Sequence, residues 1–177
     1  MRSLIAPIWS QSDACRIESG TTIFIDANIL LYAVSGHWKF GTSSKCLLDS
    51  INDGKYKGIT SVLVCSEVFH RSLIAEIVER ENISPGSVSK CLKEDPELVR
   101  DSTKAWAAIE KIRQINHLTI VGIDESILEL ALQYSKKYGL LSNDALHLAT
   151  MKREDVSTMA SNDRDFGVVK WLQIWRP

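Results

Sequence analysis

Closely spaced cysteine pairs are missing from this chain of 177 residues, which contains only four cysteines. None of them forms a Cys-x-x-Cys pair, so the sequence offers no ordinary structural zinc site and no sign of a disulfide framework. Apolar runs of membrane-spanning length are missing too, and Pro7 with the polar residues after Trp9 makes a poor signal peptide. These absences predict a protein of a reducing, cytoplasmic compartment with no membrane partner.

An excess of charge of either sign is also missing, because the net charge is −1 and the pI is about 6.4. Binding to a nucleic acid would therefore need a local basic patch or metal ions. The hydrophobic content of 45% and the charged content of 24% are ordinary for a globular protein. The length suits one domain with a sizeable core.

Strand-like and helix-like segments alternate along most of the chain. Short apolar runs predict strands at about 22–26, 56–61, 118–122, 157–161 and 169–175. Apolar spacing, N-cap residues and breakers predict helices at about 42–51, from 62, at 87–92, at 97–116, from 124 to 139, and from 142. This order predicts an α/β fold with a central parallel sheet covered by helices on both faces. Residues 1–20 show no clear period and are interpreted as an extension of unknown role, and residues 21–177 as the single domain.

The first predicted strand ends abruptly in a carboxylate. Its apolar residues 23–25 are followed by Asp26, and Asn28 comes two positions later. This pattern is typical of a buried parallel strand that carries an acid at its C-terminal end. Ligands of open α/β sheets bind at that edge, so Asp26 is the first candidate for a functional site.

Three later segments also present an acid after a strand or early in the next helix. They carry Glu67, Asp144 and Asp163, and Asp165 follows closely. In a parallel sheet these segments converge on one edge. Several carboxylates in one cleft repel each other unless divalent cations relieve the repulsion, and an all-oxygen site suits Mg²⁺ or Mn²⁺.

Each of these acids also has a purely structural interpretation. Asp26 could cap a helix, Asp144 could interact with a helix dipole, and Asp163 could belong to a turn. Glu67 could lie on a solvated helix face, although its surroundings are strongly apolar. The joint pattern favours a site, because four such coincidences are less probable than one.

Four segments resemble, in the right order, the acidic motifs of PIN-domain nucleases. They are residues 25–30, 66–68, 143–149 and 161–166, and residues 172–177 are similar to the terminal strand of that family. The resemblance covers about residues 22–177. It implies a small three-layer α/β/α domain and Mg²⁺- or Mn²⁺-dependent hydrolysis of RNA phosphodiester bonds. Many compact members, the VapC-like group, are toxins that are inhibited by a bound antitoxin and are often homodimers, which implies both partners here.

The resemblance and the chemistry of phosphodiester hydrolysis together suggest roles for the acids. Metal ions neutralise the anion, activate water and stabilise the leaving oxygen. Asp26 and Asp144 are expected to be the principal metal ligands. Asp163 is expected to be a further ligand or to orient metal-bound water, and Glu67 to hold a second metal or position the attacking water.

Supporting roles fall to neighbouring polar residues. Asn28 is expected to orient Asp26, and Ser161 to bond a ligand carboxylate or metal-bound water. Asp165 is either a fifth acid at the metals or a turn residue, and the structural role is favoured.

Two arginines and one aromatic residue are weaker candidates. Arg71 and Arg164 could contact phosphate, although a solvated or ion-paired arginine is at least as plausible. Trp38 could stack with a base, but an ordinary loop aromatic is the favoured interpretation.

Three other functions remain open on sequence grounds. The chain could be a non-catalytic PIN module that binds RNA or protein, or an RNA-processing nuclease outside toxin–antitoxin systems. A phosphohydrolase acting on small substrates is disfavoured, because Asn28 stands where a second aspartate would be expected after Asp26.

Overall fold

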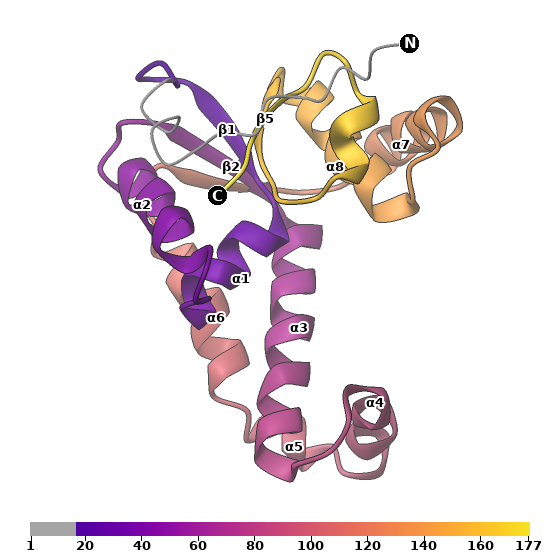
Figure 1. Ribbon diagram of the computed structural model, residues 1–177. Coiled ribbons are helices and arrows are strands. Elements are labelled where there is room, and N and C mark those ends of the chain that lie inside the picture. The colour runs from indigo at the N-terminus through magenta and orange to yellow at the C-terminus, as the bar shows by residue number, and fades with distance from the viewer. Residues whose placement is uncertain (1–16) are drawn as a thin grey trace.

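The computed structural model describes residues 17–177 and shows one parallel sheet with helices on both sides (Figure 1). Within this range the sheet has five strands in the order β3-β2-β1-β4-β5. They are β1 (Thr22–Ile25), β2 (Lys57–Ser61), β3 (Leu118–Val121), β4 (Thr158–Ala160) and β5 (Gln173–Trp175). The predicted α/β class and parallel sheet are confirmed. The predicted extension falls largely on residues 1–16, which lie outside the described residues, and Ile17 packs against the main core.

The strand that ends in Asp26 lies at the centre of the sheet. Ile23, Phe24 and Ile25 are completely buried, as an apolar run with no polar alternation requires when both faces are covered. Ile25 pairs with Ala160 of β4, so the residues that follow β1 and β4 leave the sheet side by side. The register thus brings Asp26 next to Ser161.

The helices are arranged in two unequal groups. They are α1 (Ala27–Ser35), α2 (Gly41–Asn52), α3 (Val62–Glu81), α4 (Pro85–Glu94), α5 (Glu97–Arg100), α6 (Lys104–Arg113), α7 (Glu125–Tyr138) and α8 (Ser142–Arg153). In Figure 1, α7 and α8 lie on one side of the sheet and α1, α2 and α6 on the other. Helix α3 runs from the sheet edge to a distal cluster where α4 and α5 pack. None of the helices in the described range is both long and apolar enough to cross a bilayer.

Local capping explains where several helices begin and end. Ser61 accepts a hydrogen bond from the Val64 N–H at 3.2 Å, and Asp124 accepts one from the Ile127 N–H at 3.1 Å. Gly139 ends α7 with a φ of +71°, in the left-handed region that glycine adopts without strain. These three positions agree with the sequence prediction.

The predicted continuous helix over 97–116 is wrong, because the structure divides it into α5 and α6. Residues 101–103 leave the helical path, and α6 has no side-chain cap of its own. The buried carboxylate of Glu76, on α3, caps the start of α6 instead. It accepts hydrogen bonds from the N–H groups of Thr103, Lys104 and Ala105 at 2.8, 2.9 and 3.1 Å, and also from the Ser102 hydroxyl.

The predicted strand over 169–175 is also shorter than expected. Only Gln173–Trp175 pair with β4, and a 3₁₀ helix, η2 (Asp165–Val168), comes before them. Phe166 and Val169 are both buried, and the Val169 N–H bonds the Phe166 carbonyl at 3.1 Å. Because a tight turn is needed to bury both side chains, the segment does not become an extended strand until Gln173.

Candidate functional site

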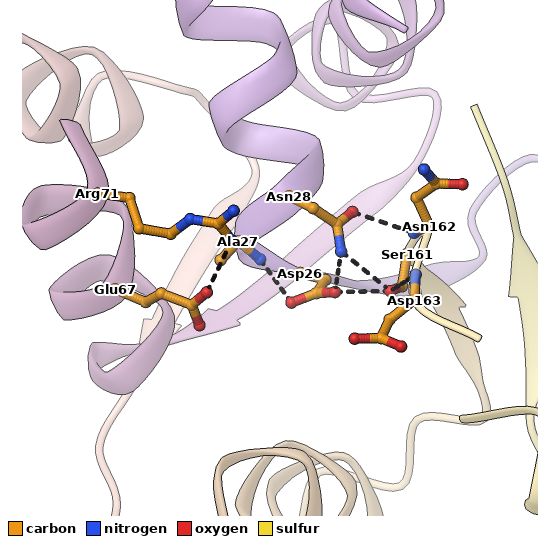
Figure 2. A network of polar contacts seen from close by, with 8 residues as sticks. All are labelled: Asp26, Ala27, Asn28, Glu67, Arg71, Ser161, Asn162 and Asp163. Atoms are coloured by element: carbon orange, nitrogen blue, oxygen red, sulfur yellow. Dashed lines mark hydrogen bonds and ion pairs between the residues drawn. The ribbon is translucent and has the colours of Figure 1, made fainter. Parts of the chain in front are cut away.

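The Asp26 carboxylate lies buried at the C-terminal end of the central strand (Figure 2). Its Oδ1 accepts a hydrogen bond from the Ala27 N–H at 2.7 Å, so Asp26 is the N-cap of α1. Its Oδ2 accepts one from the Ser161 hydroxyl at 2.6 Å and another from the Asn28 amide. The capping interpretation is therefore right, and the same carboxylate is also held from a segment 135 residues away.

Ser161 and Asn28 link the first and fourth acidic segments. The Ser161 oxygen accepts hydrogen bonds from the Asn28 amide at 3.2 Å and from the Asp163 N–H at 3.0 Å, while it donates to Asp26. The Asn28 carbonyl oxygen accepts from the Asn162 N–H at 3.0 Å. With one bond donated and two accepted, the hydroxyl is fully used and holds Asp26 in a fixed orientation. The supporting position predicted for both residues is in place.

Glu67 and Asp163 flank Asp26 on opposite sides, as Figure 2 shows. Glu67 lies in the second turn of α3 and forms an ion pair with Arg71 at 3.1 Å. Asp163 follows β4, and its Oδ1 accepts a hydrogen bond from the Asp165 N–H at 2.9 Å. Asp165 itself is exposed at the start of η2, in line with the favoured turn role.

Asp144 lies in the first turn of α8 and shares its electrostatic environment with the other acids. Burial raises its pKa to about 6, and the charges of Asp163, Asp165, Asp26 and Glu67 add to the effect. The charges of these four acids act on Asp144, so Asp144 belongs to the same acidic region as Asp26.

The pKa of Asp26 is shifted for a related reason. Burial raises it, the hydrogen bonds from Ser161 and the Ala27 N–H lower it, the charges of Glu67 and Asp163 raise it, and the net pKa is about 6. The favourable hydrogen bonds therefore do not compensate for the loss of water and the nearby negative charge.

Positive groups of the protein offset the negative charge of this region only in part: Arg71 pairs with Glu67, and the Arg176 guanidinium donates to the Asp163 carbonyl at 2.7 Å. His147 lies one turn after Asp144, but burial lowers its pKa to about 4 despite the charge of Glu67, so the ring is neutral at neutral pH. Arg71 is half exposed and already paired with Glu67. An acidic, partly dehydrated cleft of this kind favours a divalent cation from solution.

The chemistry of the donors fits a hard cation, since the set consists of carboxylate oxygens. In residues 17–177, however, no group of three or more His, Cys, Asp or Glu side chains is already gathered as a metal cluster. The structure thus brings the predicted acids to one edge of the sheet, while their roles as ligands stay predictions.

A pocket of about 390 Å³ opens beside the acids and includes two residues that the sequence analysis did not single out. Tyr32 and Asn162 line it, and the Asn162 amide donates to the Tyr32 hydroxyl at 3.2 Å. The pocket is also lined by Arg71 and Arg164, so both weak candidates border the site. Tyr32 is one helical turn after Asn28, a spacing that places the two on one side of α1 and could have identified it.

A Ser161→Ala variant is expected to ionise Asp26 only at a higher pH. The Ser161 hydrogen bond lowers the pKa of Asp26, so its loss raises that pKa further above its ordinary value. An NMR titration of the carboxyl groups of the metal-free protein from pH 4 to 9 tests this, and an unchanged titration of Asp26 would show that Ser161 does not stabilise its ionised form.

Comparisons with known proteins agree with this architecture. The family model described as the PIN domain matches residues 23–172. Ribonuclease VapC6 of Methanocaldococcus jannaschii is 28% identical over 156 residues, which cover 88% of this chain and 97% of that protein. The crystal structure of Mycobacterium tuberculosis VapC20, a sarcin–ricin loop cleaving toxin, matches with a TM-score of 0.59 at 17% identity, covering 88% of this chain and 99% of that one. VapBC2 from Rickettsia felis, bound to a promoter DNA fragment, matches with a TM-score of 0.53 at 19% identity, covering 88% and 98%.

Proposed function

This chain belongs to the PIN domain family, and on that premise we propose that it is a metal-dependent ribonuclease that hydrolyses RNA phosphodiester bonds. The observation that carries the proposal is the position of Glu67 and Asp163 on either side of the buried Asp26 carboxylate, at the C-terminal edge of the sheet. The ribonuclease name of the Methanocaldococcus jannaschii relative, which aligns over almost its whole length, supports the same activity.

The residues that would hold the metal are Asp26 and Asp144, with Glu67 and Asp163 beside them. A bound Mg²⁺ or Mn²⁺ ion would supply charge neutralisation, an activated water and stabilisation of the leaving oxygen. Ser161 and Asn28 keep the Asp26 carboxylate fixed, so little reorganisation is needed when the ion binds.

The phosphate backbone of the substrate requires positive groups near these acids. Arg71 and Arg164 border the adjoining pocket and are the groups that would contact it. They provide the local cationic patch that a chain with a net charge of −1 needs in order to bind RNA.

The biological setting that we propose is a toxin–antitoxin pair in the cytoplasm. The similarity to a VapC ribonuclease and to the solved VapBC2 structure supports a protein antitoxin as partner. We also propose a homodimer, which sedimentation of the purified protein would test. An RNA-processing role outside such pairs would instead give a protein that needs no partner to be tolerated in cells.

Removal of divalent cations is expected to abolish the activity reversibly. Single-stranded RNA incubated with the purified protein should be cut in the presence of Mg²⁺ or Mn²⁺, remain intact with EDTA, and be cut again when the ion is restored in excess. Cleavage that persists in EDTA, or no cleavage with either ion, would contradict the proposal. A phosphate monoester assayed in parallel should not be hydrolysed, which separates this function from that of a small-molecule phosphohydrolase.

A further inference from the structure

The pocket beside the acids has the chemistry of a nucleotide subsite. It is formed by α1, α3 and the segment after β4, and its lining consists of two arginines, two asparagines, Tyr32 and one carboxylate, that of Asp163. Arg164 is exposed and forms no ion pair with any of residues 17–177. An unpaired guanidinium beside amide groups suits an anionic, hydrogen-bonding ligand such as a nucleotide.

A group of aromatic rings leads from this pocket to the surface. Tyr32 contacts His37 and Phe40, with ring centroids 4.7 and 5.0 Å apart. His37 in turn stacks on Phe40 at 12° and lies nearly parallel to Trp38 at 6.1 Å. The Trp38 side chain is 89% exposed, so its indole face is open to a ligand.

The loop that carries Trp38 is held in a defined conformation. The Nδ1 atom of His37 accepts hydrogen bonds from the N–H groups of Lys39 and Phe40 at 3.3 and 3.2 Å. The His37 N–H and carbonyl also bond Tyr32 and Gly41 of the flanking helices, at 3.0 and 2.7 Å. A large apolar ring that is almost fully hydrated on an anchored loop is a ready stacking surface, because little order has to be imposed when a base binds.

We propose that the pocket and Trp38 together form a subsite for single-stranded RNA. A phosphate next to the scissile bond lies against Arg164 and Arg71, and the base of a flanking nucleotide stacks on the Trp38 indole. The inference rests on the proposed nuclease function and adds to it a residue that would bind the substrate beside the acids. A paired base has both faces covered by its neighbours, so the subsite selects unpaired RNA over duplex. This assigns to Trp38 the stacking role that the sequence alone disfavoured.

The test measures binding apart from cleavage. In a full-length Asp144→Asn background, a fluorescein-labelled single-stranded oligoribonucleotide is titrated and its anisotropy recorded. An added Trp38→Ala change should weaken binding by about 5- to 100-fold, and Trp38→Phe should restore most of the affinity. Because stacking involves no counterions, Trp38→Ala should leave the salt dependence unchanged. Arg164→Ala should lower the slope of log affinity against log salt by about 0.7, the value for one phosphate contact on a single strand.

Matched controls are available on the same chain. Trp106, on α6, is also exposed, and Arg113 at the end of that helix is an exposed arginine, so Trp106→Ala and Arg113→Ala should bind as the parent does. Equal affinity of the Trp38→Ala and Trp106→Ala proteins, or equal loss for single-stranded and duplex RNA, would overturn the inference.

A kinetic measurement separates this inference from the nuclease proposal. In the otherwise unchanged protein, Trp38→Ala should raise KM and leave kcat close to its original value, since the ring acts in binding rather than in bond cleavage. If the unchanged protein cuts no RNA with either ion, the nuclease proposal fails, whereas Trp38-dependent binding can still be scored. If it cuts RNA but KM is unaffected by Trp38→Ala, only the subsite is wrong.

Discussion

An Asp144→Asn protein should lose metal-dependent RNA cleavage by at least about 100-fold, because a metal contribution of several kcal/mol to the transition state depends on this carboxylate. The amide keeps the size and much of the hydrogen-bonding capacity of the acid, so the loss reflects charge. The rate of cleavage of a single-stranded RNA at saturating Mg²⁺ measures it. Full activity in the purified variant would remove Asp144 from the site.

The same change should stabilise the metal-free protein above pH 6. An acid whose folded pKa is raised from 3.8 to about 6 destabilises the folded state once it is ionised, and the effect disappears as pH falls below the unfolded value. Solvent screening and the favourable helix-dipole position of Asp144 reduce the benefit to about 1 kcal/mol, or roughly 2–4 °C in Tm. Thermal unfolding in EDTA at pH 7.5 and pH 4 tests the sign.

A first-turn acid outside the cleft provides the control for both measurements. Glu125 opens α7, is exposed, and does not contribute to the pKa shift of Asp144. Glu125→Gln should leave cleavage unchanged and should not raise Tm. An equal gain in Tm from both variants would mean that the benefit of Asp144→Asn does not come from the acidic cleft.

A Glu76→Ala change should cause the largest loss of stability, about 2–4 kcal/mol in the free energy of unfolding. It would leave the buried Ser102 hydroxyl and the first N–H groups of α6 without their acceptor, and each such group costs energy when it is desolvated. Urea unfolding followed by circular dichroism measures it. Glu79→Ala, one turn later on α3, removes an exposed carboxylate paired with Lys104 and should cost well under 1 kcal/mol. Similar losses from both changes would contradict the capping role.

Lowering the pH should weaken the same interaction between the Glu76 carboxylate and the start of α6. Burial would raise the pKa of Glu76, but the bonds from Ser102 and from the N–H groups of Thr103, Ala105 and Lys104 together lower it below its ordinary value of 4.5. A lowered acid pKa stabilises the fold above the unfolded value and is lost as pH falls through the folded one. The stability difference between the parent and Glu76→Ala should therefore shrink below pH 4.5.

Local sequence patterns predicted most of the helices and strands. They failed where contacts between distant segments determine where an element begins or ends. The apolar run before Asp26 and the cap at Ser61 are local signals, and both elements formed as expected. The division between α5 and α6 depends on Glu76, a residue 27 positions before Thr103. The helical periodicity of residues 97–116 cannot predict that contact. Glu76 itself stands in the apolar run Leu73–Val78, but nothing in that run indicates which N–H groups its carboxylate would accept from.

The candidate site shows the same contrast. Strand ends and helix starts were enough to place Asp26, Glu67, Asp144 and Asp163 at one edge of the sheet. The bond from the Asn162 N–H to Asn28 and the position of Tyr32 over the pocket depend on how α1 meets the segment after β4. Such contacts follow from the register between β1 and β4, which single segments do not specify.

The register of β1 has a consequence for the order of events during protein synthesis. Its partner β4, and the Ser161 hydroxyl that completes the Asp26 environment, come from the far end of the chain. Contacts of such large sequence separation form late, after the long intervening segment has closed. A growing polypeptide on the ribosome therefore has no assembled acidic edge until translation has passed Asp163.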